Sequence, residues 1–285
     1  MKGMKTDMKT AMFAIILALT ATSIHAGSGG PSQNAETNAL IVTGINKSVK
    51  DRQTKDKAVV DLRTFFLSSV AIRKDRLAVL ANSRGLVEDD SQVSTAANLK
   101  SRIDEAARVV RTSDRFMFYY VGQANIADGK LRLNLPGADI THEQLAQWLS
   151  RIRASSALIV LDCPGAGLAV KALAGPGRII VAGCTAEQPY STRFSEYFVP
   201  ALSDAQSDAD DDGRVSLLEA FTSASKKLDD FYREVGLLKT ETPMLEDNAD
   251  GQASDQPWKH ELNRGDGLAA SKFFFSSQKR GAVSP

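Results

Sequence analysis

The chain has 285 residues, of which 43% are apolar and 24% charged, and 35 basic side chains nearly balance 34 acidic ones. This composition is that of an ordinary globular protein, with enough apolar residues for one large core plus tails. It excludes a nucleic-acid-binding protein of the basic type, because no basic stripe is present.

The first 26 residues have the pattern of a secretory signal peptide. Three lysines open the segment, an apolar run covers residues 11–21, and Ala26 supplies the small residue at the cut. The apolar run is shorter than the roughly 20 residues of a membrane-spanning helix, so a membrane anchor is the weaker interpretation. We therefore expect an exported chain, periplasmic or extracellular, with no integral membrane segment after signal removal. Cleavage lowers the net charge from +1 to −1.

Strands and helices alternate along the first part of the chain. Residues 27–38 (GSGGPSQNAETN) are polar and Gly/Ser-rich, which predicts a flexible leader. We then predict buried strands at 39–44 and 76–81, because both are short apolar runs, and helices at 55–68 and 95–110, where apolar residues recur at helical spacing. This alternation favours a doubly wound α/β fold.

Two later stretches predict the central strands. Residues 115–125 (RFMFYYVGQAN) and 157–167 (ALIVLDCPGAG) are apolar runs that stop abruptly at Gly, Asn or Pro, as strands buried on both faces do. Ligands of open parallel sheets collect beyond the carboxyl ends of such strands. The two tips, Gly122-Gln123 and Asp162-Cys163-Pro164, are therefore the first place to expect a site.

The intervening and following segments complete the expected domain. Residues 130–135 alternate polar and apolar, which predicts an exposed or edge strand, and Thr141 with Gln144 forms a capping box that opens a helix at 143–152. Residues 178–183 (RIIVAG) predict another buried strand. The polar loop that follows carries Gln188 and ends near Arg193; these side chains either line the mouth of a pocket or face water.

The two strand tips carry a family resemblance. A strand ending Tyr-x-Gly, followed by one ending Asp-x-x-x-Ala-Gly, resembles the caspase and legumain-like cysteine peptidases, including bacterial members, from about residue 39 to 258. The resemblance implies a caspase-like three-layer α-β-α sandwich with a mostly parallel central sheet. It also implies a general-base His at the first tip and a nucleophilic Cys at the second. This chain has Gln123 and Pro164 at those positions.

This substitution predicts a degenerate catalytic centre. A glutamine amide donates and accepts hydrogen bonds but passes on no proton near neutral pH. We expect a non-catalytic pseudopeptidase that binds a peptide or protein, with Gly122, Asp162, Gln188 and Arg193 at the binding site. The alternative is an active cysteine endopeptidase using Cys163.

That alternative depends on which way Cys163 points. It lies one residue before the nucleophile position, and adjacent strand residues face opposite sides, so a bulge is needed to turn it toward the pocket. The three histidines offer no obvious base, since His25 lies in the signal segment, His142 in the first turn of a predicted helix and His260 in the polar tail. Cys163 and Cys184 form a disulfide in an oxidising compartment, or else are two buried thiols.

Residues 208–219 (DADDDGRVSLLE) match the calcium loop of an EF-hand. Alternate oxygen donors converge on one cation, a glycine at position 6 allows the sharp turn, and an acid at position 12 closes the shell. The expected ligands are Asp208, Asp210, Asp212, Arg214 through its carbonyl group, Ser216 and Glu219. The alternative is a solvated acidic loop that caps a helix.

Calcium is thus the expected cofactor, and a calcium-binding structural envelope protein is a further alternative function. A partial copy of the loop at residues 246–251 (EDNADG) has Pro257 where the closing acid belongs. Residues 259–285 predict a polar tail, in which the aromatic residues 273–275 dock on the domain or on a partner.

Overall fold

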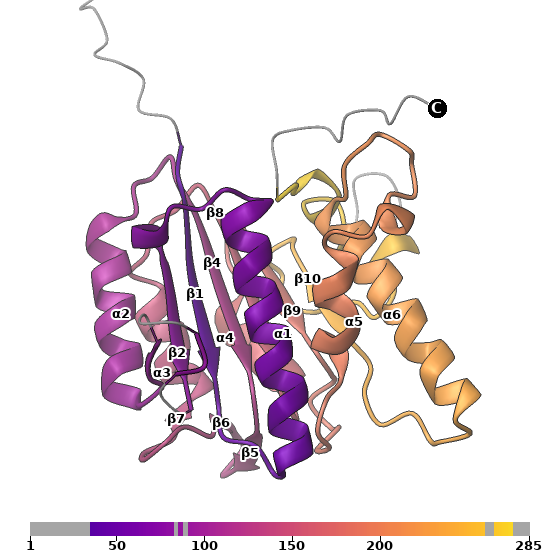
Figure 1. Ribbon diagram of the computed structural model, residues 1–285, viewed down its shortest axis with the longest axis horizontal. Helices are drawn as coiled ribbons and strands as arrows, with labels where there is room; N and C mark the ends of the chain where they lie inside the picture. The colour runs from indigo at the N-terminus through magenta and orange to yellow at the C-terminus, as the bar shows by residue number, and fades with distance from the viewer. Residues whose placement is uncertain (1–34, 83–84, 88–90, 260–264, 276–285) are drawn as a thin grey trace, which may run out of the picture. The chain divides into compact units, whose positions relative to one another are not determined.

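The computed structural model describes residues 35–82, 85–87, 91–259 and 265–275 (Figure 1). The expected signal peptide, residues 1–26, and the leader up to residue 34 lie outside the described residues. None of the helices in the described part of the chain is both long and apolar enough to cross a membrane.

Seven strands of the described residues form one central sheet in the order β10-β9-β8-β4-β1-β2-β3. Every neighbouring pair is parallel except β10 and β9, which are antiparallel. The prediction of an α/β fold with a mostly parallel sheet is confirmed. The strands are β1 (Thr37–Thr43), β2 (Leu77–Ala81), β3 (Ser91–Val93), β4 (Arg115–Val121), β8 (Ser156–Asp162), β9 (Arg178–Ala182) and β10 (Met244–Glu246).

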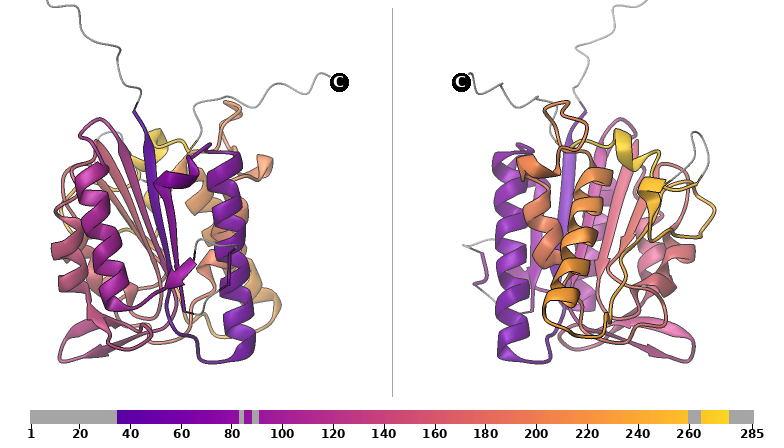
Figure 2. Two further views of the ribbon diagram at one scale, coloured as in Figure 1. Left: turned by 60° about the vertical axis from the view of Figure 1, so that its left-hand side comes forward. Right: turned by 90° about the vertical axis from the view of Figure 1, so that its right-hand side faces the viewer.

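Helices cover both faces of this sheet (Figures 1 and 2). Side chains alternate along each strand, so Ile41 of β1 faces one layer and Val42 the other, and both are fully buried. On one face lie α1 (Val49–Ser68), α5 (Phe194–Ala201) and α6 (Leu217–Glu234). On the other lie α2 (Ala96–Val109), α3 (His142–Leu149) and α4 (Val170–Leu173).

The helix starts follow from local capping. The predicted capping box at α3 is confirmed, with Thr141 and Gln144 exchanging side-chain and backbone hydrogen bonds. Helix α1 begins at Val49, six residues before the predicted start, after the N-cap Ser48. Its first turns are polar, so hydrophobic periodicity could not mark them. Short 3-10 turns occur at Lys74–Arg76, Ala166–Ala169, Ala205–Ser207, Pro257–Lys259 and Ala270–Lys272.

A second, antiparallel sheet contains β5 (Ala124–Ala127), β6 (Lys130–Leu133) and β7 (Ile140–Thr141). The prediction that residues 130–135 form an exposed or edge strand is wrong, because β6 pairs on both sides and all four of its residues are at least partly buried. The alternating pattern of these residues indicated that one face of the strand is buried, but it gave no information about which strands lie beside it. Asp128 and Gly129 both have positive φ, which gives the β5–β6 hairpin the tight turn that suits twisted strands.

The strand order places a crevice between β1 and β4. From β1 the chain first builds β2 and β3 on one side, and then returns to build β4, β8 and β9 on the other. The connections after β1 and β4 therefore leave in opposite directions. Ligand sites of open α/β sheets lie beyond the carboxyl ends of the strands at this reversal.

The described fold continues past the expected domain boundary at residue 258. Residues 265–275 return to the domain, where Phe273 and Phe275 are buried. The guanidinium group of Arg115 lies 4.0 Å from the centre of the Phe273 ring, and Phe275 makes an edge-on contact with Phe65. The aromatic residues thus dock on the chain's own domain.

Candidate functional site

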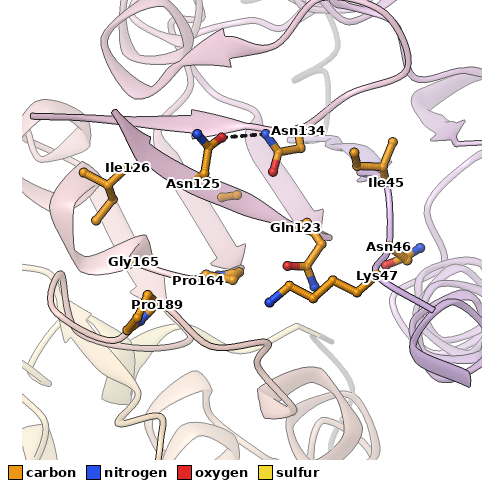
Figure 3. A pocket seen from close by; sticks show the side chains of 11 residues that line it. Ile45, Asn46, Lys47, Gln123, Asn125, Ile126, Asn134, Pro164, Gly165 and Pro189 are labelled. Atoms are coloured by element: carbon orange, nitrogen blue, oxygen red, sulfur yellow. Dashed lines mark hydrogen bonds between the residues drawn. The ribbon is translucent and has the colours of Figure 1, made fainter. Parts of the chain in front are cut away.

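A pocket of about 530 Å³ lies at the carboxyl ends of β1, β4 and β8, where the strand order reverses (Figure 3). Gln123 and Pro164 both line it, so the two substituted positions come together. The full lining is Ile45, Asn46, Lys47, Gln123, Ala124, Asn125, Ile126, Asn134, Pro164, Gly165 and Pro189.

Two glycines let the ends of β1 and β4 approach at the base of this pocket. A Cβ atom on Gly122 would lie 2.6 Å from the Cα atom of Gly44, so no other residue fits without backbone movement. The Gly44 N–H donates to the carbonyl of Val121 at 2.9 Å, and the Gln123 N–H donates to Ile45 at 2.9 Å. The close approach of these two backbones, joined by both hydrogen bonds, fixes where Gln123 lies.

The small sheet forms one wall of the pocket. Asn134, which directly follows β6, accepts a hydrogen bond from the Ile45 N–H at 2.9 Å and donates its own N–H to the Gln123 carbonyl at 3.0 Å. The Asn134 side-chain amide donates to Asn125 at 2.7 Å, as drawn in Figure 3, and to Asp139 at 2.9 Å. The wall is thus attached to both strand ends, and its carboxamide groups lie beside the pocket.

The Gln123 side chain is held in place by hydrogen bonds. Its Nε2 donates to the Ser191 hydroxyl at 2.7 Å and to the Asp51 carboxylate at 3.3 Å. Asp51 also pairs with the buried Lys55, at 3.2 Å. A glutamine fixed in this way can orient a ligand but cannot act as a general base.

Cys163 points away from the pocket into the core. Its side chain is 0% exposed and packs in the layer of α3 and α4, whereas the neighbouring Asp162 bonds to Ser195 of α5. Burial raises the pKa of the Cys163 thiol well above its usual range, and Cys184 and Asp162 add to this effect. The thiolate, which is the reactive form, is therefore strongly disfavoured.

Both cysteines are free thiols in the structure. The Cys184 thiol donates a hydrogen bond to the carbonyl oxygen of Cys163 at 3.2 Å. Burial raises the pKa of Cys184 to about 12. Of the two alternatives left open by the sequence, this geometry corresponds to buried thiols that act as small core residues.

The four expected binding residues support the pocket without lining it. Gly122 permits the close approach to Gly44, and Asp162 is a buried acceptor for the N–H group of Ser195 at 2.8 Å and for its hydroxyl. The side-chain amide oxygen of Gln188, Oε1, accepts the N–H groups of Thr185 and Thr242, which braces the loop that carries Pro189.

Arg193 also faces away from the pocket. Its guanidinium group pairs with Glu196 at 3.3 Å and stacks on the Phe231 ring at 4.7 Å. Its backbone N–H donates to the buried Glu241 at 2.7 Å, and Tyr232 donates to the same carboxyl group at 2.9 Å. Burial is the main cause that raises the pKa of Glu241 to about 7.

Several lining residues escaped the sequence analysis, namely Ile45, Asn46, Lys47, Ile126 and Pro189. They follow separate strands or lie in loops, and only the strand order brings them together. The Thr-Gly pair that ends the first predicted strand was the sequence feature that could have pointed to the lining residues that follow it.

The expected metal ligands of the 208–219 loop do converge. Asp208, Asp210 and Asp212 have carboxylate oxygens that all lie within 4.8 Å of one another, the only such set among the described residues. Gly213 has a φ of 84°, as the sharp turn requires. Hard oxygen donors on a flexible loop are the ligands that calcium prefers.

The other three expected ligands have additional contacts. Glu219 accepts the Ala209 N–H at 2.8 Å and forms a capping box with Ser216. The Arg214 guanidinium pairs with Asp212 at 2.8 Å and stacks on the Phe274 ring. The loop is thus formed by its own hydrogen bonds, in which the carboxylates of Asp208 and Asp212 accept backbone N–H groups.

No protein-family model matches the chain, and no curated protein matches it.

Proposed function

We propose that this protein is an exported, caspase/legumain-like pseudopeptidase whose pocket holds a segment of a peptide or protein. The observation that carries the proposal is that Gln123 and Pro164, which replace the family's base and nucleophile, line one pocket at the reversal of the strand order. The buried thiol of Cys163 gives no support to the alternative of an active endopeptidase.

The pocket's chemistry suits an extended peptide. Ile45, Ile126 and two prolines offer apolar surface, while Gln123 and the asparagines offer amide groups that pair with a peptide backbone. Lys47 adds one positive charge to the lining, which favours a ligand with an acidic or carboxyl-terminal group.

A peptide array tests this function. The protein is applied to a diverse set of octapeptides, and affinities of the bound sequences are measured by fluorescence anisotropy. We expect Ile126→Asp, which places a charge in the pocket, to weaken binding at least tenfold. The matched control is Val60→Asp, since Val60 is similarly exposed (38% against 45%) but lies three turns along α1.

The peptides recovered from the protein distinguish binding from cleavage. We expect them intact. Cleavage that disappears in Cys163→Ala would establish the endopeptidase instead, and an array with no bound sequence would refute the proposed pocket function.

We further propose that the 208–219 loop binds one calcium ion in a structural role. The convergence of Asp208, Asp210 and Asp212 supports this. Calorimetric titration with calcium should show one bound ion fewer in Asp210→Asn than in the parent protein; a variant that binds as many ions as the parent would refute it.

A further inference from the structure

A second acidic loop, residues 246–252, follows β10 and repeats the backbone of the first. In the 208–219 loop, the N–H groups at positions 5, 6 and 7 donate to the acids at positions 3, 1 and 5. In the second loop Asp250 N–H donates to Asn248 at 2.9 Å, Gly251 N–H to Glu246 at 3.4 Å, and Gln252 N–H to Asp250 at 2.7 Å. The same positions are bonded in the same way.

The backbone angles repeat as well. Positions 4 and 6 have positive φ in both loops: Asp211 (56°) and Gly213 (84°) in the first, Ala249 (69°) and Gly251 (75°) in the second. Glu246, Asn248 and Asp250 therefore stand where Asp208, Asp210 and Asp212 stand in the first loop.

The missing closing acid comes from a distant part of the chain. In the first loop the position-12 carboxylate, that of Glu219, accepts the N–H of position 2, Ala209, at 2.8 Å. In the second loop the N–H of position 2, Asp247, donates at 3.2 Å to Asp266. Asp266 thus accepts the hydrogen bond that the position-12 acid accepts in the first loop, whereas position 12 of the second loop is Pro257.

Burial supplies an observation independent of the loop geometry. Glu246 is 0% exposed, and within the described residues its Oε2 atom has no hydrogen-bond partner. Asp266 is only 7% exposed. Among the described residues no lysine or arginine forms an ion pair with Glu246, Asp250 or Asp266, although these carboxylates lie close enough to repel one another. Buried carboxylates without a cation are costly, so this arrangement favours a positively charged ligand.

We propose that Glu246, Asn248, Asp250 and Asp266 form a second divalent-cation site, of the calcium type. These side chains, with the backbone carbonyl of Gln252 at position 7, offer only hard oxygen donors, and no cysteine or histidine belongs to the set. The carboxylates are spaced more widely than the Asp208 set. The site is separate from the first loop and does not depend on it.

The second site would hold the C-terminal segment on the domain. Besides Asp266, that segment is bonded through Gly267 and Ala270, whose N–H groups donate to Asp247 at 2.9 and 2.7 Å. The first loop holds the same segment further along, because the Leu217 N–H donates to the carbonyl of Phe273. A cation at residue 266 therefore fastens residues 265–275 at their beginning.

Calcium titration of a chain with a disabled first loop tests this proposal. The Asp208→Asn/Glu219→Gln double variant is titrated by calorimetry, and its melting temperature is compared in calcium and in EGTA. We expect one calcium ion to bind and the melting temperature to rise. Adding Asp266→Asn should abolish both effects, whereas adding Asp255→Asn, a nearby exposed acid, should change neither.

The metal-free melting temperature controls for misfolding. In EGTA, Asp266→Asn should be at least as stable as its background, because it removes one of several mutually repelling carboxylates. A folded double variant that binds no calcium would overturn the second site and leave the first intact. A parent that binds one ion, keeps it in the double variant and loses it with Asp266→Asn would instead refute the first site.

Discussion

The first prediction concerns Glu241, whose buried carboxyl group lies near the loop that carries Pro189, and tests how its charge affects the stability of the protein. Its carboxyl group is fully buried and accepts hydrogen bonds from the Arg193 N–H and the Tyr232 hydroxyl. The perturbation is Glu241→Gln. Glutamine keeps the shape, accepts the Arg193 N–H with its oxygen and donates its amide to Tyr232, whose own hydrogen can turn to Thr240.

The magnitude follows from the pKa of Glu241, which is about 7 in the folded protein against 4.5 for the free group. Between those values the folded state holds a proton that the unfolded state has released, so stability falls as the pH rises. Each pKa unit corresponds to about 1.4 kcal/mol, which gives a total cost of about 3 kcal/mol above pH 8. Below pH 4.5 both states are protonated and the cost vanishes.

Urea unfolding at a series of pH values measures this cost. With EGTA present, Glu241→Gln and the parent should have equal free energies of unfolding near pH 4, and the variant should be more stable by about 3 kcal/mol at pH 8. Glu187→Gln, in the exposed part of the same loop, is the matched control. The reasoning is refuted if Glu241→Gln is less stable than the parent at pH 8, because the charged carboxylate would then be the favoured form.

Two further predictions concern the strand ends. Gly122→Ala should cost about 3 kcal/mol, and lower the melting temperature by roughly 5–10 °C, because its Cβ meets backbone atoms. Gly175→Ala should have little effect, because its Cβ would meet only the Arg178 side chain, at 3.8 Å; equal melting temperatures for the two variants would contradict the close approach of Gly122 to Gly44. In the folded protein Cys163 and Cys184 should not react with Ellman's reagent, and both should react after unfolding. The control Ile126→Cys should add one thiol that reacts at once in the folded protein. A thiol of the native parent that reacts quickly would contradict the buried positions of both cysteines.

Features that depend on neighbouring residues were predictable from the sequence. The apolar runs of β1, β4 and β8 gave the central strands, and the side-chain pattern at Thr141 and Gln144 gave the start of α3. The spacing of Asp208, Asp210 and Asp212 gave their convergence. Each depends on a few consecutive residues, because helix capping, strand burial and a ligand loop all act over short distances along the chain.

Features that join distant segments were decided only by the tertiary structure. Strand order put Ile45, Gln123 and Pro164 around one pocket, and the return of the C-terminal segment placed Asp266 against the loop at residue 246. Whether a bulge turns Cys163 toward the pocket was likewise settled only by the structure, in which its side chain packs in the layer of α3 and α4. Amino-acid patterns record whether a residue is buried, but they carry no information about which distant residue buries it, because that partner is fixed by the packing of the whole sheet and its helices.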